Sequence, residues 1–174
     1  MVDLTTKRIS GKIDFDDEHQ GTLQANSNRM KTVAVDNYRE DKYYPRVVLA
    51  VAKILSRSNV VAPVDVLLQM GNLTKQNFEA WRRGKVPYLE YVIEGNLSKA
   101  TRILRIIGFH VHDLNMVPQN TVYRQLGRSR NRVLQFTKSG IKRLEEAYCR
   151  HYVWNQSQEK KQQVVDRGIA EYEA

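Results

Sequence analysis

The chain has 174 residues, of which 41 % are hydrophobic, and a formal net charge of +9 at pH 7. This length suits one domain, or one domain with a small second module, and the apolar fraction supports a packed core. The single cysteine, Cys149, excludes an intramolecular disulfide and argues against a cysteine-based zinc site. No N-terminal run resembles a signal peptide, and no stretch approaches the roughly 20 apolar residues that span a bilayer. We therefore expect no membrane association and a reducing, cytoplasmic compartment.

The positive charge is concentrated in the middle of the chain. Residues 1–41 carry 6 basic and 8 acidic side chains, residues 42–154 carry 19 and 7, and residues 155–174 carry 3 and 4. A strongly basic region attracts nucleic acid, because each phosphate contact releases a condensed counterion. We therefore expect a polar N-terminal arm over 1–41, a basic helical nucleic-acid-binding domain over 42–154 and a polar C-terminal tail over 155–174. The alternative is a domain that is basic without binding nucleic acid.

Two helices are predicted at the start of the basic region. Apolar residues recur at helical spacing over 43–55, and the polar pair at 58–59 ends that run. Pro63, a residue favoured in a first helical turn, opens a second helix that ends at Met70. Gly71 follows directly, and glycine adopts the left-handed conformation that closes many helices. The chain is therefore expected to turn sharply after Met70.

The stretch after this turn carries the strongest functional signal. We predict a third helix over 74–83, capped by the Thr74 hydroxyl and stopped by Gly84. Phe78 and Trp81 are three residues apart and share one face, so both are expected to pack inward. The remaining surface carries amide and cationic groups, namely Lys75, Gln76, Asn77 and Arg82. An apolar back with donor groups in front suits a helix that lies in a DNA groove.

Further elements follow towards the C-terminus. The apolar spacing predicts helices over 87–94, 97–114 and 119–127, a strand over 133–137 and a final amphipathic helix over 139–153. The predicted fold class is therefore mainly α. It is a helix-turn-helix-containing helical domain with at most a small β element and polar N- and C-terminal arms.

An internal similarity links two of these segments. Residues 73–85 and 116–128 align at an offset of 43, with the matched pairs Gln76-Asn77 and Gln119-Asn120, and Gly84-Lys85 and Gly127-Arg128. Each segment follows an apolar helix that ends in a turn. The alignment indicates two helix-turn-helix units, over 62–85 and 97–128. Chance similarity between short windows is the alternative.

The run Thr121-Val122-Tyr123-Arg124 resembles the start of the recognition helix in helix-turn-helix domains of resolvases and many bacterial regulators. In those families a small hydroxyl residue and an arginine at these places contact phosphate or a base edge. The resemblance implies that Thr121 contacts the DNA backbone and that Val122 packs inward. It also implies that Tyr123 and Arg124 face the groove. The resemblance is one of architecture and identifies no specific family.

The predicted binding residues follow from the chemistry of nucleic acids. Arginine pairs with phosphate or guanine through two N–H groups, and amide side chains match the edge of adenine. The predicted nucleic-acid-binding residues are Lys75, Gln76, Asn77, Arg82, Arg83, Lys85, Gln119, Asn120, Thr121, Tyr123, Arg124, Arg128, Arg130 and Arg132. Tyr123 is also the predicted stacking partner for a base. A solvated basic surface is the alternative, because charged side chains usually face water.

No catalytic, metal or cofactor site is predicted. His110 and His112 lie two residues apart on a helix, where side chains diverge by about 200°, so they cannot hold one ion from the same face. Cys149 and His151 are separated in the same way. The chain has no P-loop, no glycine-rich dinucleotide motif and no paired-carboxylate arrangement.

Together these patterns favour a non-enzymatic DNA-binding protein of the helix-turn-helix type, with transcription regulation as the expected role and DNA favoured over RNA. Arginine clusters would dock the protein by charge, and amide side chains would read bases. A homodimer or a partner protein is expected to form through the helix predicted over 139–153. Two alternatives remain open. One is an interaction subunit of a larger protein or ribonucleoprotein assembly, and the other is an enzyme that acts on nucleic acid.

Overall fold

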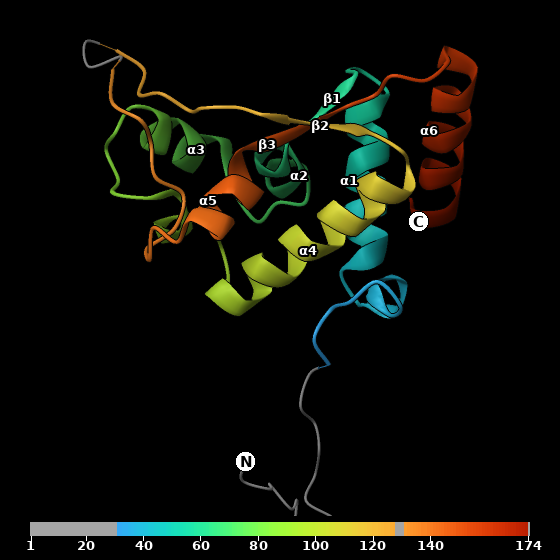
Figure 1. The fold of residues 1–174 in the computed structure, drawn as a ribbon, viewed down its shortest axis with the longest axis horizontal. Coiled ribbons are helices and arrows are strands. Elements are labelled where there is room, and N and C mark those ends of the chain that lie inside the picture. The colour runs from blue at the N-terminus through green and yellow to red at the C-terminus, as the bar shows by residue number, and fades with distance from the viewer. Residues whose placement is uncertain (1–30, 128–130, 174) are drawn as a thin grey trace, which may run out of the picture. The chain divides into compact units, whose positions relative to one another are not determined.

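Helix α1 (Tyr44–Leu55) lies at the centre of the computed structural model, which describes residues 31–127 and 131–173 (Figure 1). The described residues from Thr32 onward form one unit. The helices that contact α1 are α2 (Pro63–Gln69), α4 (Leu97–Asp113) and α6 (Gln158–Tyr172). Because α1 is covered on several sides, it is apolar on more than one face. Its fully buried side chains include Val47, Val51 and Leu55.

A small antiparallel sheet joins segments that are far apart in the chain. Its strands are β1 (Val60–Val61), β2 (Val117–Asn120) and β3 (Arg150–Val153), in the order β1-β3-β2. Val153 of the central strand lies opposite Val60 on one side and Val117 on the other. The sheet therefore anchors both ends of the stretch between β2 and β3, which contains several of the predicted binding residues.

The mainly α character predicted from the sequence is confirmed. The described residues contain six α-helices and the small sheet. The helices predicted at 43–55, 63–70 and 97–114 correspond to α1, α2 and α4. The predicted turn is also present before α3 (Lys75–Arg82), because Gly71 has a φ of 76° and Thr74 Oγ1 accepts a hydrogen bond from the Asn77 N–H at 3.1 Å.

The predicted helix over 119–127 is wrong. Residues Val117–Asn120 form β2, and the chain continues beyond β2 without helical structure. Pairing with β3 competes with helix formation here, and Pro118 has no N–H to donate to a helical turn. Consequently the second predicted helix-turn-helix unit, over 97–128, contains one α-helix instead of two.

Two shorter predicted elements also differ from the structure. The segment 87–94 contains only the single 3₁₀ turn η2 (Leu89–Tyr91). The segment 133–137 contributes one bridge residue, Val133, and forms no strand of its own. Both segments are short, so the local propensity of their residues has little influence on their secondary structure. Contacts with neighbouring elements have a larger influence.

The predicted helix over 139–153 is two elements instead of one. α5 (Lys142–Cys149) ends where β3 begins, because Tyr152 pairs with Val61 on one side and Pro118 on the other. Since β3 is the central strand of the sheet, only α5 remains of the predicted partner surface.

Residues from both expected polar arms take part in the packed unit. Tyr38, in the 3₁₀ turn η1 (Tyr38–Glu40), is buried, and so is Val165 of α6. Ser157 caps α6 by accepting a hydrogen bond from the Lys160 N–H at 3.3 Å. The unit therefore extends beyond the 42–154 boundaries that charge alone indicates, because a few apolar side chains are enough to cover α1. Residues 1–30 of the expected N-terminal arm lie outside the described residues.

α6 approaches α1 closely at Gly168. A Cβ placed on this glycine would lie 2.8 Å from the Ala52 Cβ. We predict that Gly168→Val forces the two helices apart and lowers the free energy of unfolding by about 1–3 kcal/mol, as overpacked cores do. Denaturant unfolding measures this change. The control is Gly108→Ala in α4, where a Cβ meets nothing within 4 Å and should stabilise the helix. Equal stability of Gly168→Val and the unsubstituted protein would contradict the close approach.

A buried titratable side chain, His110, lies near the end of α4 and is 7 % exposed. Burial lowers its pKa from 6.5 to about 4, Asp113 acts in the opposite direction, and Arg167 and Arg39 lower the pKa further. The imidazole is therefore neutral in the folded protein at pH 7.

This burial predicts a loss of stability in acid. Between pH 6.5 and about 4 the unfolded chain binds a proton at His110 that the folded protein does not. Stability should therefore fall as the pH drops through this window, by at most about 3 kcal/mol. His110→Phe should remove that part of the dependence, whereas His151, whose pKa burial also lowers, titrates in both proteins. Urea unfolding across the window tests this, and identical pH slopes for the two proteins would contradict it.

Candidate nucleic-acid interface

Two segments of the chain, residues 121–127 and 131–137, run antiparallel beside α3 (Figure 1). Together they are called the hairpin. The Leu134 N–H donates to the Tyr123 carbonyl at 2.8 Å, and the Gln125 N–H donates to the Arg132 carbonyl at 2.9 Å. An isolated bridge pairs Arg124 with Val133. The extended backbone is therefore held by cross-strand hydrogen bonds, as in a two-stranded ribbon.

The hairpin is attached directly to the C-terminal end of α3. The Leu126 N–H donates to the Arg82 carbonyl at 2.7 Å, and Arg82 Nη1 donates to the Arg124 carbonyl at 3.0 Å. Trp81 Nε1 donates to the Gln135 carbonyl at 2.8 Å. Arg82 and Arg83 at the end of α3 and Arg124 and Arg132 of the hairpin therefore lie on adjoining elements.

An aromatic cluster fixes the position of the hairpin against α3. Trp81 is fully buried, as the sequence predicted, and its ring centroid lies 5.5 Å from that of Tyr123 and 5.0 Å from that of Phe136. Phe78 lies on the same side of α3, with its centroid 6.1 Å from that of Trp81. Rings at these separations contribute beyond the area they bury, so the contact is well suited to holding the two elements together.

Tyr123 does not face outward, contrary to the orientation predicted from the sequence. Its hydroxyl lies 2.9 Å from His151 Nε2, and burial raises the pKa of Tyr123 well above its ordinary value. Thr121 also turns inward, where its hydroxyl donates to the Cys149 carbonyl. Val122, expected inside, is 60 % exposed. The reason is that side chains alternate in extended backbone, whereas the prediction assumed a helix.

The structure places the predicted residues in four groups. Exposed side chains are Lys75, Gln76, Arg83, Lys85, Gln119, Asn120, Arg124 and Arg132. Half-buried on α3 are Asn77 and Arg82, and turned inward are Thr121 and Tyr123. Arg128 and Arg130 lie outside the described residues.

The exposed cations at the junction of the two elements, called the basic face, are Arg83, Lys85, Arg124 and Arg132. Within residues 31–127 and 131–173, no ion pair involves any of these four side chains. Two neighbouring carboxylates bind other groups. Glu145 accepts hydrogen bonds from the Phe136 and Thr137 N–H groups at 2.9 and 2.7 Å, and Glu90 accepts from the Lys138 N–H at 3.1 Å. The basic face is therefore available to an external anion.

Arg82 differs from the basic face because it holds the hairpin in place. Besides its hydrogen bond to the hairpin backbone, its guanidinium carbon lies 5.2 Å from the Tyr123 ring centroid. Asn77 also makes a contact within the protein, because its Nδ2 donates to the Val92 carbonyl at 3.4 Å. Both residues were predicted to contact nucleic acid, and the structure gives them contacts within the protein.

Gln125 is a further residue at this junction that no sequence pattern indicated. Its side chain lies against Gly84, where a Cβ would come within 2.6 Å of the Gln125 amide. Gln125 Oε1 is buried and has no hydrogen-bond partner among the described residues. Gly84 is therefore favoured by its φ of 72°, and a Cβ at this position would displace only the end of the Gln125 side chain.

Within the described residues, no group of three or more His, Cys, Asp or Glu side chains could hold a metal ion. His110 is buried, whereas His112 is exposed, so the two imidazoles lie in different environments. In the part of the chain that the structure describes, every helix is too short or too polar to cross a membrane.

No protein-family model, curated protein or solved structure matches the chain. The geometry of the chain itself therefore carries every functional argument that follows.

The two neighbouring arginines of α3 are expected to behave differently when each is replaced. Arg82→Ala removes a hydrogen bond and a cation–π contact, so it should lower the free energy of unfolding by about 1–2 kcal/mol. Arg83→Ala removes an exposed side chain and should change stability by less than about 0.5 kcal/mol. Thermal or denaturant unfolding of the two variants tests this difference. Equal losses would show that Arg82 does not hold the hairpin.

Proposed function

We propose that this protein is a non-enzymatic DNA-binding protein that docks the basic face on duplex DNA, with transcription regulation as its role. The observation that supports the proposal most directly is the packing of α3 against the hairpin. This packing brings together cations from two adjoining elements, and none of these cations forms an ion pair among the described residues. Neither element alone would present the whole set. Several phosphate contacts made together give affinity through the release of counterions.

The two elements offer different routes into a groove. The major groove of B-form DNA admits either an α-helix or a two-stranded ribbon, and the junction provides both shapes. Gln76 is exposed on α3, and Gln119 and Asn120 are exposed on β2. Amide side chains match the adenine edge, so these residues would supply limited reading of bases once the cations have docked.

Duplex DNA is favoured over duplex RNA for a geometric reason. The major groove of A-form RNA is deep and narrow, and side chains cannot read it. Single-stranded binders instead present aromatic faces to the bases. Tyr123, the aromatic residue predicted for that role, is occupied by contacts inside the protein. The hairpin and α3 therefore fit a B-form groove better than either RNA alternative.

A partner protein is the second candidate, because the hairpin also exposes apolar side chains. Val122, Leu126 and Val133 are 60, 49 and 57 % exposed. Such side chains are common at the core of protein interfaces, with cations at the rim. An interaction subunit of a larger protein or ribonucleoprotein assembly would use the same surface.

The decisive test reverses charge on the basic face without touching Arg82. We expect the unsubstituted protein to bind a short DNA duplex with an affinity that falls steeply between about 50 and 200 mM salt. The double variant Arg83→Glu, Lys85→Glu should weaken binding at least about tenfold and make the salt dependence shallower by roughly two phosphate contacts. Fluorescence anisotropy measures both quantities.

The matched control is Lys160→Glu, Lys161→Glu at the start of α6, which makes the same change in net charge away from α3 (Figure 1). It should bind DNA much more tightly than the double variant of the basic face. Equal weakening by the two pairs would show attraction by net charge alone, and a salt-independent affinity would favour the partner protein. Parallel titrations with duplex RNA and single-stranded DNA decide between the classes of nucleic acid.

A further inference from the structure

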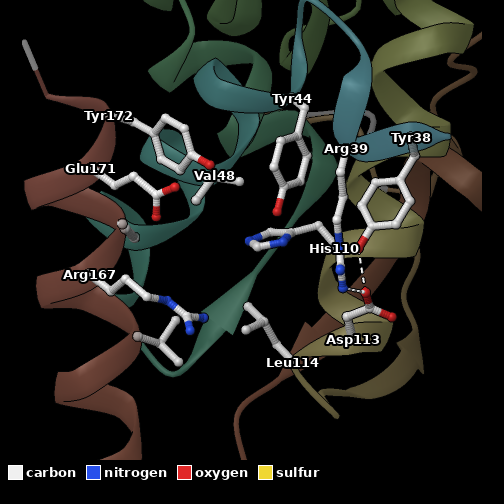
Figure 2. A pocket seen from close by; sticks show the side chains of 13 residues that line it. Tyr38, Arg39, Tyr44, Val48, His110, Asp113, Leu114, Arg167, Glu171 and Tyr172 are labelled. Atoms are coloured by element: carbon white, nitrogen blue, oxygen red, sulfur yellow. Dashed lines mark hydrogen bonds and ion pairs between the residues drawn. The ribbon is translucent and has the colours of Figure 1, made fainter.

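A cavity of about 460 Å³ lies between α1, the C-terminal end of α4 and α6, and no part of the basic face lines it. Figure 2 shows side chains of α6 on one side of it and side chains of η1, α1 and α4 on the other. This volume is in the range of sites that hold small molecules, about 300–1,000 Å³. The lining combines a few apolar side chains with several polar groups, and the polar groups supply the larger part of the exposed lining.

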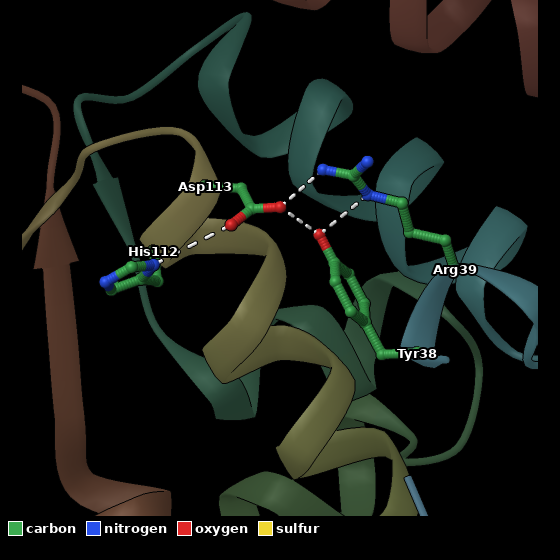
Figure 3. A network of polar contacts seen from close by, with 4 residues as sticks. All are labelled: Tyr38, Arg39, His112 and Asp113. Carbon is green, nitrogen blue, oxygen red and sulfur yellow. Dashed lines mark hydrogen bonds and ion pairs between the residues drawn. The ribbon is translucent and has the colours of Figure 1, made fainter. Parts of the chain in front are cut away.

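A network of polar contacts builds one wall of the cavity (Figure 3). Asp113 Oδ2 accepts hydrogen bonds from the Tyr38 hydroxyl and from Arg39 Nη2, the latter at 2.6 Å, and Arg39 Nε donates to the Tyr38 oxygen at 3.1 Å. The hydrogen bond from Tyr38, followed by the contacts of Arg39, lowers the pKa of Asp113. The charges of Arg39 and Asp113 therefore offset each other within this wall.

The remaining polar groups of the cavity are mainly hydrogen-bond donors without acceptors. His110 is buried, with 7 % of its surface exposed. Its ring nitrogens have no hydrogen-bond partner among the described residues. Its ring lies edge-on to Tyr44, with centroids 5.8 Å apart, and Figure 2 shows both side chains facing the same space as Arg167. Within the described residues, no hydrogen bond or ion pair is found for the Tyr44 hydroxyl or the Arg167 guanidinium.

The acidic side chains of the cavity do not satisfy these donors. Asp113 is occupied by Tyr38 and Arg39, and the Glu171 carboxylate interacts with the Tyr172 hydroxyl. A guanidinium carries five N–H donors, a neutral imidazole one and a phenol one, so the space between α4 and α6 has a clear excess of donors. A ligand that accepts hydrogen bonds would pair with these donors, the exposed Arg167 among them.

We propose that this cavity binds a small organic anion, with one carboxylate or phosphate group attached to an apolar or planar body. The acidic group would accept hydrogen bonds from Arg167, His110 and the Tyr44 hydroxyl, with Arg167 supplying the opposite charge. The apolar body would lie against the apolar side chains that line the cavity, namely Val48, Ala52 and Val164. This site is independent of the basic face and of the function proposed for it.

The test titrates the full-length protein with phenyl phosphate and with benzoate, and follows chemical shifts in ¹H–¹⁵N spectra. Benzyl alcohol, which has the same ring without the charge, and inorganic phosphate, which has the charge without the ring, serve as comparison ligands. At least one aromatic anion should bind more tightly than both comparison ligands, with shifts concentrated in residues around the cavity. The relative affinities of phenyl phosphate and benzoate decide which acidic group the site prefers.

Variants then separate this site from general attraction of anions. Arg167→Gln should weaken binding of the aromatic anion at least about tenfold, the loss expected for a charge-assisted hydrogen bond. Lys160→Gln, which removes the same charge from an exposed position of the same helix, should leave binding unchanged. His110→Phe should also weaken binding while retaining the aromatic packing beside Tyr44.

Three results would overturn the proposal. The first is the absence of saturable binding of either aromatic anion up to about 10 mM, which corresponds to a negligible affinity. The second is binding of benzyl alcohol as tight as that of the anions, because the donors would then contribute nothing. The third is an equal effect of Arg167→Gln and Lys160→Gln in proteins whose thermal unfolding shows that both are folded. None of these outcomes depends on DNA binding.

Discussion

The burial of α1 is the constraint on which the arrangement of this protein depends. A helix that is apolar on several faces is stable in water only if other elements cover each face, and removing this much apolar surface from water is the largest favourable contribution to folding. α2, α4 and α6 supply the cover, and β1 follows α1 directly into the sheet. Because α6 closes one side, the last helix belongs to the packed unit in spite of its polar composition.

The sheet and the aromatic cluster fix the position of the candidate interface relative to the rest of the packed unit. β3 pairs with β1 and β2, so the chain leaves the sheet at Asn120 and returns to it at Arg150. Within that excursion, Trp81 is buried against Tyr123 and Phe136 and donates to the hairpin backbone. The position of the cations is therefore set by a buried tryptophan, and the cations themselves contribute little to holding the elements together. Such a division suits a binding surface, since the cations form no ion pair among the described residues and Arg124 gives up only its hydrogen bond to the Asn131 carbonyl when it turns to a ligand.

The two proposed sites use positive charge in different surroundings. The basic face is exposed, so its attraction for phosphate is screened by salt and is effective only through several contacts made together. In the cavity at α6, the exposed Arg167 lies beside a buried imidazole and a half-buried phenol, so an anion there would combine one charge contact with hydrogen bonds to two less exposed groups. Between them α4 carries Arg102, which bonds to the buried Asp41 and ties the chain before α1 to α4.

The sequence by itself determined the features that depend on neighbours along the chain. The helices α1, α2, α3 and α4, the Thr74 cap, the left-handed glycines at 71 and 84 and the inward face of Phe78 and Trp81 all follow from periodicity and local steric preference. The concentration of charge in the middle of the chain was equally visible. Only the tertiary structure decided that 117–120 and 150–153 are strands, because their partners lie far away in the sequence and pairing overrides weak local propensity. For the same reason only the structure decided that Tyr123 faces inward, that Arg82 supports the hairpin, and that His110 and Arg167, from helices distant in sequence, share a cavity.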